Sequence, residues 1–385
     1  MLTKRVKRLN ESMTIAISTL ARNLKAEGKD ILSFSAGEPD FDTPEIIKEE
    51  AIKAIKKGFT KYTAVAGIPE LLEAISAKLE RDNGLKYKPS NIIASNGAKH
   101  SLFNLTQALI EEDDEVIIPS PYWVTYPELV RYSGGIPITV ETNDESGFKI
   151  SAKQLKDAIT PRTKMLILTT PSNPTGSVYS KEELEEIAEV LKGSDIFVCS
   201  DEMYEKLVYD TEFVSVASIS EDMFQRTITV NGLSKSVAMT GWRFGYLATP
   251  LDELIDAMKK LQSQSASNIN SITQHAAIAG LDGRADKDIE FMRKEFQKRR
   301  DLAINMINEI DGLSVVKPDG AFYLFINIKE ISNNSMKFAE DLLAKKGVAV
   351  IPGVGFGSEG YVRFSFATDE QSIIEGIKRI KEFVN

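Results

Sequence analysis

The fold of this chain is decided by the stretch KMLILTTPSNPTGSVYSKEELEEIAEVLKGSDIFVCS, residues 164–200. It contains two short apolar runs, 164–170 and 195–200, separated by a helical pattern over 181–191. Gly, Pro, Ser or Asn bound both runs, as expected at the ends of strands. A strand, a helix and a second strand in this order predict part of a mostly parallel sheet.

The same alternation continues on both sides of this stretch. Further bounded apolar runs lie at 91–95, 114–120, 226–232 and 243–249, and helical patterns lie at 71–81, 98–111, 123–132 and 251–264. We therefore expect an α/β fold in which helices cover both faces of the sheet. Ligands of such sheets bind beyond the carboxyl ends of the strands.

The pattern changes after residue 286. One long charged helix is predicted over 286–309, followed by strands at 320–328, 348–352 and 361–367 and by helices at 335–346 and 369–384. These elements predict a smaller α+β domain. No Pro- or Gly-rich linker precedes it, so we expect the two domains to pack tightly.

Composition excludes several kinds of site. The 385 residues include 56 acidic and 47 basic side chains, a formal net charge of −9, two histidines and one cysteine. A Cys/His zinc site needs three or four ligands and an internal disulfide needs a second cysteine, so we expect neither, and no metal. The acid–base group of an enzyme with so little histidine is expected to be a Lys, Asp, Glu or Tyr.

Charge and hydropathy also limit the partners. The acidic balance argues against nucleic acid or an anionic membrane, because both need clustered Lys and Arg. No run approaches the length of a membrane-spanning helix, and the charged N-terminus does not resemble a signal peptide, so we expect a cytoplasmic protein. GFGSEG at 355–360 matches GxGxxG but precedes a predicted strand, which argues against a dinucleotide site.

One lysine has surroundings that suit covalent chemistry. Lys235 lies in NGLSKSVAMTGWRFGY (231–246), just beyond the strand at 226–232, with Ser234 before it and Arg243 eight residues later. A lysine on a loop is usually solvated. Held among small residues beside a buried strand, it could lose its proton well below its ordinary pKa of about 10.4 and form a Schiff base with an aldehyde.

Three other segments end strands with polar groups. Asp201 follows the strand at 195–200, where it either holds a proton on a heterocyclic nitrogen or caps a short helix. Asn173 lies in PSNPTG (171–176), which presents an amide or is simply a turn. The strand-to-helix turn at Gly97 could bind a phosphate through free backbone amides, although such turns need glycine for structural reasons too.

Together these segments resemble the class I pyridoxal-phosphate enzymes of the aspartate aminotransferase fold, most closely the bacterial and archaeal aspartate aminotransferase subgroup. Nine segments carry the resemblance in order: AGEPDFDTP (36–44), KYTAVAGIPELLEA (61–74), SNGAKHSLFN (95–104), PYWVTYPE (121–128), PSNPTG, SDEMYEKLVY (200–209), NGLSKSVAMTGWRFGY, GAFYLF (320–325) and VRFSFAT (362–368). The resemblance implies a seven-stranded, mostly parallel sheet in a large cofactor-binding domain at 45–290. It also implies a small domain formed by 1–44 and 291–385.

The resemblance assigns roles around the ring of pyridoxal 5'-phosphate. Lys235 would bind the cofactor covalently and shuttle the proton between the substrate Cα and the cofactor, while Asp201 would pair with the protonated ring nitrogen. Asn173 and Tyr204 would hydrogen-bond the phenolic oxygen. Trp123 would stack on the ring, although an aromatic residue that begins an amphipathic helix is more often part of the core.

The phosphate would lie on the amides of Gly97, Ala98 and Lys99, with help from Ser234 and Arg243. Tyr62 is the position that reaches the phosphate of the neighbouring subunit in this family, which implies a homodimer with shared active sites.

The resemblance also implies how amino-acid and 2-oxo-acid substrates bind. Arg363 would grip the α-carboxylate in a two-bond fork, with a backbone contact from Gly37 and with Asn173 and Trp123 nearby. Lys99, Thr14 and Ser18 would read the distal carboxylate, which predicts transfer of the amino group of L-aspartate to 2-oxoglutarate by a ping-pong mechanism.

Other activities stay open on the sequence alone. The alternatives are an aminotransferase for aromatic amino acids or alanine, a C–S lyase, and a cofactor-binding module without catalysis. Members of the subgroup that also accept prephenate carry a lysine where this chain has Asn10, which argues against that second activity.

Overall fold

The computed structural model describes residues 1–10 and 13–385, with side chains described at 1–10 and 17–385. Its larger lobe is built on a seven-stranded sheet of order β2-β8-β7-β6-β5-β3-β4. The strands are β2 (Ile92–Asn96), β3 (Glu115–Ser120), β4 (Ile136–Glu141), β5 (Thr163–Thr169), β6 (Phe197–Asp201), β7 (Thr227–Gly232) and β8 (Phe244–Ala248). Strand β8 pairs antiparallel with β2 and β7, and the other pairings among these described strands are parallel. The expected mostly parallel sheet is confirmed.

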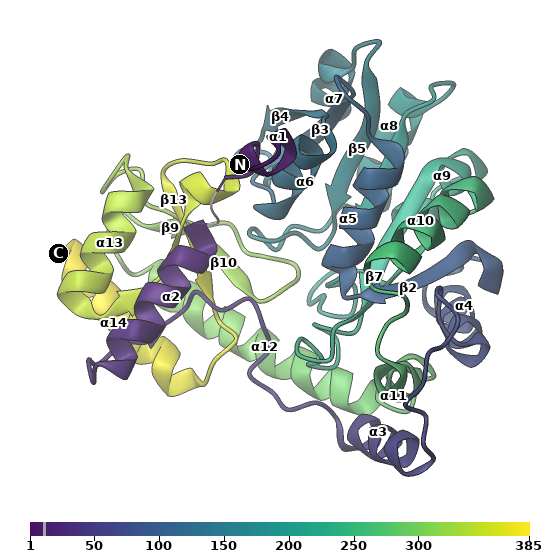
Figure 1. Ribbon diagram of the computed structural model, residues 1–385. Helices are drawn as coiled ribbons and strands as arrows, with labels where there is room; N and C mark the ends of the chain where they lie inside the picture. Colours follow the sequence, from purple (N-terminus) through teal and green to yellow (C-terminus); the bar gives the residue numbers. More distant parts are fainter. Residues whose placement is uncertain (11–12) are drawn as a thin grey trace.

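Alternate residues of these strands are buried on opposite faces, which explains their continuous apolar runs. Ile167 of β5 packs in one core cluster with Leu105 of α5 (Ala98–Leu109). Its neighbour Leu166 packs in another cluster with Leu184 of α8 (Lys181–Leu191). The two helices therefore cover opposite faces of the sheet (Figure 1).

Other helices complete the larger lobe. They are α3 (Glu45–Lys56), α4 (Pro69–Asn83), α6 (Thr125–Ser133), α7 (Ala152–Ala158), α9 (Glu221–Arg226), α10 (Asp252–Ser265) and α11 (Ser271–Leu281). Strand β4 was not expected from the sequence. It is a half-exposed strand at the edge of the sheet, paired only with β3 among the described strands, so it lacks a buried apolar run.

The smaller lobe carries a four-stranded sheet of order β12-β13-β10-β9. Its elements are α12 (Asp286–Ile307), β9 (Ser314–Val315), β10 (Tyr323–Asn327), α13 (Ser335–Lys346), β11 (Val348–Ala349), β12 (Ile351–Pro352), β13 (Tyr361–Ser365) and α14 (Glu370–Val384). The single strand expected over 348–352 is two strands, because β11 pairs with β1 (Leu32–Ser33) while β12 pairs with β13. Strand β10 starts later than expected because Ala321 has a φ of +57°.

The N-terminal segment lies with the smaller lobe. Besides the pairing of β1 with β11, helix α2 (Met13–Ala26) packs on β11 and β12, while the short α1 (Lys4–Lys7) contacts α6 of the larger lobe. Helix α12 runs between the lobes (Figure 1) and packs on both, so the division at residue 290 stays a prediction. No helix in the described part of the chain combines the length and apolarity needed to cross a membrane.

Candidate active site

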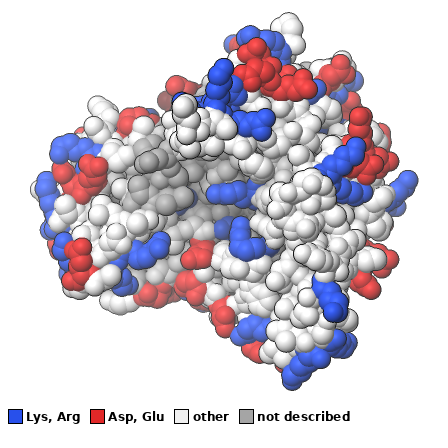
Figure 2. Space-filling view, in the orientation of Figure 1, with Lys and Arg blue, Asp and Glu red and all other residues white. Residues whose placement is uncertain are grey.

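A cavity of about 450 Å³ lies at the carboxyl ends of the central strands. Figure 2 shows Lys and Arg side chains inside the hollow between the two lobes. Of the residues predicted for the site, those that line the cavity are Ser18, Gly37, Ala98, Lys99, Trp123, Asn173, Asp201, Tyr204, Ser234, Lys235, Arg243 and Arg363. The structure thus brings together residues that are spread over most of the sequence.

Lys235 lies in the loop after β7, and its side chain is half-buried. Its Nζ donates a hydrogen bond to the carbonyl of Gly37. Burial lowers the pKa of Lys235 to about 8; the charge of Glu38 opposes this shift, and the charges of Arg363 and Arg243 add to it. A lysine that is partly neutral near pH 8 can act as a nucleophile or a base.

Asp201 is the last residue of β6 and is buried. Its Oδ2 accepts a hydrogen bond from the Tyr126 hydroxyl at 2.6 Å, and its Oδ1 accepts one from the Met203 amide at 3.3 Å. Burial raises the pKa of Asp201, while these hydrogen bonds and the charge of Lys235 lower it. Turns rather than a helix follow Asp201, so it is not a helix cap, and its carboxylate faces the cavity.

Arg363 of β13 is buried at the other wall of the cavity. Its two terminal nitrogens donate to Asn173 Oδ1 at 2.9 Å and to the carbonyl of Ser35 at 2.8 Å, while its Nε has no hydrogen-bond partner among the described residues. Its guanidinium forms no ion pair within the described part of the chain. Burial lowers its pKa. A buried guanidinium without a counter-charge favours binding of a carboxylate.

The start of α5 forms an anion site. Gly97 precedes the helix with a φ of +80°, and the amides of Ala98 and Lys99 have no carbonyl partner one turn earlier. Arg243 lies against this turn: a Cβ on Gly97 would come within 2.6 Å of its Nη2. Its Nη1 is held by the carbonyl of Thr240 at 2.8 Å. The amides and the guanidinium therefore face the same space.

Lys99 and α2 supply further polar groups to the cavity. The Lys99 ammonium lies 4.9 Å from the centre of the Trp123 ring, and burial lowers its pKa. Ser18 donates to Ser35 Oγ at 3.0 Å. Arg22, one helical turn after Ser18, also lines the cavity.

Three predicted residues, Gly97, Thr14 and Tyr62, are not among those that line the cavity, although Gly97 directly precedes α5 at its edge. Thr14 falls within 11–16, whose side chains lie outside the described residues. Tyr62 is 89% exposed and does not line the cavity. The predicted contact of Tyr62 with a cofactor phosphate therefore requires a second subunit.

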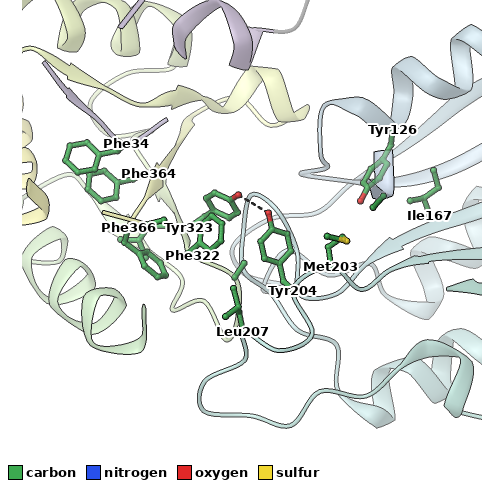
Figure 3. Close-up of a cluster of buried hydrophobic side chains, with 14 of the residues drawn as sticks. Phe34, Tyr126, Ile167, Met203, Tyr204, Leu207, Phe322, Tyr323, Phe364 and Phe366 are labelled. Carbon is green, nitrogen blue, oxygen red and sulfur yellow. Dashed lines mark hydrogen bonds between the residues drawn. The ribbon is translucent and has the colours of Figure 1, made fainter. Parts of the chain in front are cut away.

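Sequence reasoning missed several residues that line the cavity: Arg22, Ser35, Glu38, Tyr126, Thr169, Met203, Thr240 and Tyr323. Tyr126 and Tyr323 were within segments PYWVTYPE and GAFYLF, but nothing local showed what they contact. Figure 3 shows the side chains of Tyr204 and Tyr323 pointing toward one another, and their hydroxyls are 2.9 Å apart. Burial raises the pKa of both phenols.

Comparison with known proteins adds independent evidence. The model of the family "Aminotransferase class I and II" matches residues 29–380. An aspartate aminotransferase of Bacillus subtilis (strain 168) is 47% identical over 389 residues, covering 100% of this chain and 98% of the relative. A probable aspartate/prephenate aminotransferase of Aquifex aeolicus (strain VF5) is 47% identical over 386 residues, covering 99% and 98%. The structure of Thermus thermophilus aspartate aminotransferase with maleate superposes with a TM-score of 0.96 at 42% identity, covering 99% of both chains.

Proposed function

Because the chain belongs to the class I and II aminotransferases, we propose that its cavity binds pyridoxal 5'-phosphate and exchanges the amino group of L-aspartate with 2-oxoglutarate. The observation that carries the proposal is the buried Arg363, with its unpartnered Nε, in one cavity with the half-buried Lys235. The Arg363 guanidinium suits the α-carboxylate of an amino acid, and the Lys235 amine suits proton transfer at the adjacent Cα.

The residues present fit the cofactor. The amides that begin α5, with Arg243 and the buried Ser234, suit its phosphate. Asp201, whose carboxylate accepts two hydrogen bonds from the described part of the chain, suits its protonated ring nitrogen. Tyr204 and Asn173 supply polar groups for its phenolic oxygen. When bound, the cofactor supplies an aldehyde and an electron sink for the substrate carbanion.

The chain's own residues then divide the work. Arg363 and the Gly37 backbone orient the substrate through its α-carboxylate, and Lys235 Nζ takes the proton from Cα and returns it. Tyr126 holds the Asp201 carboxylate at 2.6 Å. This contact fixes the orientation of the carboxylate without requiring its protonation.

A dicarboxylic substrate is supported by the surplus of cations in the cavity. Beyond Lys235, Arg243 and Arg363, the cavity is lined by Lys99 and Arg22. Two of the reported relatives carry aspartate in their names, and the Thermus thermophilus enzyme was solved with maleate, a dicarboxylate. With one carboxylate on Arg363, the second would lie near Lys99 and Ser18.

Prephenate is a second candidate, favoured by the name of the Aquifex aeolicus relative. Sequence reasoning connected Asn10 with this activity. Its backbone amide and its side-chain Nδ2 donate hydrogen bonds to the Glu128 carboxylate at 2.7 Å and 3.1 Å. It does not line the cavity. We therefore rank prephenate below aspartate.

We further propose a homodimer with shared active sites. Ile52, Ile55, Phe59 and Tyr62 expose large apolar side chains within eleven consecutive residues on and after α3. Clustered apolar exposure of this kind is typical of a contact surface. In a dimer formed through this surface, Tyr62 would reach the partner's phosphate.

The test of the reaction is a half-reaction panel. The aldehyde form of the cofactor-loaded enzyme is mixed with aspartate, glutamate, alanine or phenylalanine, the amine form is mixed with prephenate, and the change in cofactor absorbance is followed. Aspartate and glutamate are expected to react fastest. Rapid reaction with phenylalanine or alanine but not with aspartate contradicts the substrate assignment.

The test of the lysine is chemical trapping. Borohydride reduction and peptide mapping are expected to find the cofactor on Lys235, and Lys235→Ala is expected to lose transamination. Replacement of the exposed Lys287 by Ala serves as control. A Lys235→Ala protein with the parental rate would refute the mechanism.

A further inference from the structure

The segment that follows β6 places acidic side chains on both of its sides. Asp201 and Tyr204 line the cavity, whereas Glu202 and Glu205, each next in sequence, do not. The intervening turn is closed by a hydrogen bond from the Glu205 amide to the Glu202 carbonyl at 3.0 Å. In this segment, Asp201 and Tyr204, both proposed to contact the cofactor, are each followed by a glutamate whose carboxylate is bound outside the cavity.

Glu205 is anchored on α4. Its Oε1 accepts a hydrogen bond from Lys78 Nζ, and its Oε2 accepts one from Asn83 Nδ2 at 2.8 Å. Lys78 also donates to Asn83 Oδ1 at 2.9 Å. The side chains of Lys78 and Glu205 are only 5% and 6% exposed, so this is a buried ion pair with its polar atoms satisfied.

Glu202 is anchored on the segment before α9. It accepts hydrogen bonds from Ser200 Oγ at 2.9 Å, from Ser215 Oγ at 2.8 Å and from the Val216 amide at 3.2 Å. It is completely buried, and burial raises its pKa to about 7, with the charge of Glu205 acting in the same direction. The turn is thus tied at both ends.

Buried ion pairs of this type contribute little net stability. The cost of removing two charges from water roughly cancels their attraction, so apolar side chains of similar size often serve as well. In some proteins such a pair instead specifies geometry. Here Asn83 bonds both members of the pair, which fixes where the Glu205 carboxylate lies. Tyr204 is covalently next to Glu205, and its hydroxyl meets Tyr323 of the smaller lobe at 2.9 Å.

We propose that Lys78 and Glu205 are positioning residues, which hold the 201–205 turn so that Tyr204 and Asp201 meet the cofactor correctly. The inference rests on the proposed function. Lys78 and Glu205 do not line the cavity, and they act only through the turn.

The experiment compares wild type with Lys78→Met/Glu205→Leu, which removes both charges and preserves volume. We measure thermal unfolding of the apoprotein, its affinity for pyridoxal phosphate by Trp fluorescence, the pH midpoint of the bound cofactor's absorbance band, and kcat and KM. The unfolding midpoint is expected to stay close to wild type. We expect kcat to fall roughly 10- to 100-fold, with weaker cofactor affinity and a shifted pH midpoint.

The control removes a different ion pair, whose residues do not line the cavity. Arg226→Met/Asp222→Leu deletes a pair on α9 whose nitrogen and oxygen are 2.7 Å apart, with the arginine 10% exposed and the aspartate 45% exposed. This control is expected to keep the wild-type kcat and pH midpoint. A purely structural role of Lys78 and Glu205 predicts the same result for both double variants.

Glu205→Gln covers the case in which the double variant does not fold. It keeps an acceptor for Lys78 and a side chain of equal size, and we expect a smaller loss of kcat with a shifted pH midpoint. The inference alone is overturned if the wild type is active and a folded variant, double or single, keeps the wild-type kcat, pyridoxal phosphate affinity and pH midpoint. A wild type that neither binds pyridoxal phosphate nor transaminates rejects the proposed function and this inference with it.

Discussion

The position of Lys235 in the cavity lowers the free energy of unfolding of the apoprotein. Its pKa falls from 10.5 to about 8 because burial disfavours the charged amine. At about 1.4 kcal/mol per pKa unit, this shift corresponds to at most roughly 3 kcal/mol lost by the apoprotein when the amine is charged, because solvent partly screens the half-buried side chain. Functional residues often lower the stability of the folded state, because their activity requires an environment that is unfavourable for folding.

We predict that Lys235→Met stabilises the apoprotein at pH 7. Below pH 8 the amine is charged in both the folded and the unfolded state, so the whole penalty is present there. Between pH 8 and 10.5 only the unfolded state keeps the proton, so the penalty shrinks, and above 10.5 it is gone. Urea unfolding at pH 7 and pH 10.5 measures the difference.

The gain at pH 7 is expected to be at most roughly 3 kcal/mol. Lys287→Met, at an exposed position in α12, is the control and is expected to change stability little at either pH. A Lys235→Met apoprotein that is no more stable than wild type at pH 7 would show that burial does not lower the pKa of this lysine.

At the scale of elements, the approach of α5 to β8 builds the anion site. A Cβ on Gly245 of β8 would lie 2.2 Å from the Ala98 amide nitrogen and 2.6 Å from the Gly97 carbonyl carbon. Only a glycine at 245 lets the first turn of α5 lie directly on the strand. The free amides of α5 therefore reach the cavity because of a residue nearly 150 positions later in the chain.

We predict that Gly245→Ala weakens cofactor binding at least about tenfold and lowers stability by about 1 to 3 kcal/mol, because the start of α5 must shift. The control is Gly241→Ala, four residues earlier, where a Cβ meets nothing within 4 Å and φ is not positive. Fluorescence titration of both apoproteins with pyridoxal phosphate, together with urea unfolding, measures the two effects. Equal cofactor affinity in the two variants would contradict this account of the anion site.

The elements themselves were mostly predictable from the sequence, and the exceptions have physical reasons. Helix α8 begins and ends as expected, because Ser180 caps it and its apolar residues follow a regular helical spacing. Strand β4 escaped detection because a half-exposed edge strand has no continuous apolar run. The division of 348–352 into β11 and β12 depends on which strands are available as partners.

At the scale of the whole molecule, the proposed dimer decides whether the site is complete. Tyr62 is 89% exposed, and it does not line the cavity that contains Lys235 of its own subunit. The neighbouring Ile52, Ile55 and Phe59 expose apolar surface on the same segment. A partner that covers this segment would bury the apolar surface and bring a second Tyr62 to the phosphate site.

We predict that Ile55→Asp, at a position 54% exposed, weakens the dimer at least about 100-fold, because burying a carboxylate in an apolar interface is costly. Cofactor affinity is expected to fall together with dimer population. Ile374→Asp on α14, 38% exposed, is the control and is expected to leave both unchanged. Sedimentation equilibrium with and without pyridoxal phosphate measures this, and a monomeric wild type with full cofactor affinity would contradict the shared site.

The sequence by itself determined the alternation of strands and helices, the burial of the sheet on both faces, and the set of loops at its carboxyl edge. These follow from local periodicity and chain order, which each segment carries within itself. Only the tertiary structure decided which side chains meet. Asn173 meets Arg363 across 190 residues, Tyr126 meets Asp201 across 75, and Lys78 meets Glu205 across 127. Such contacts depend on how distant surfaces pack, and no local pattern records that.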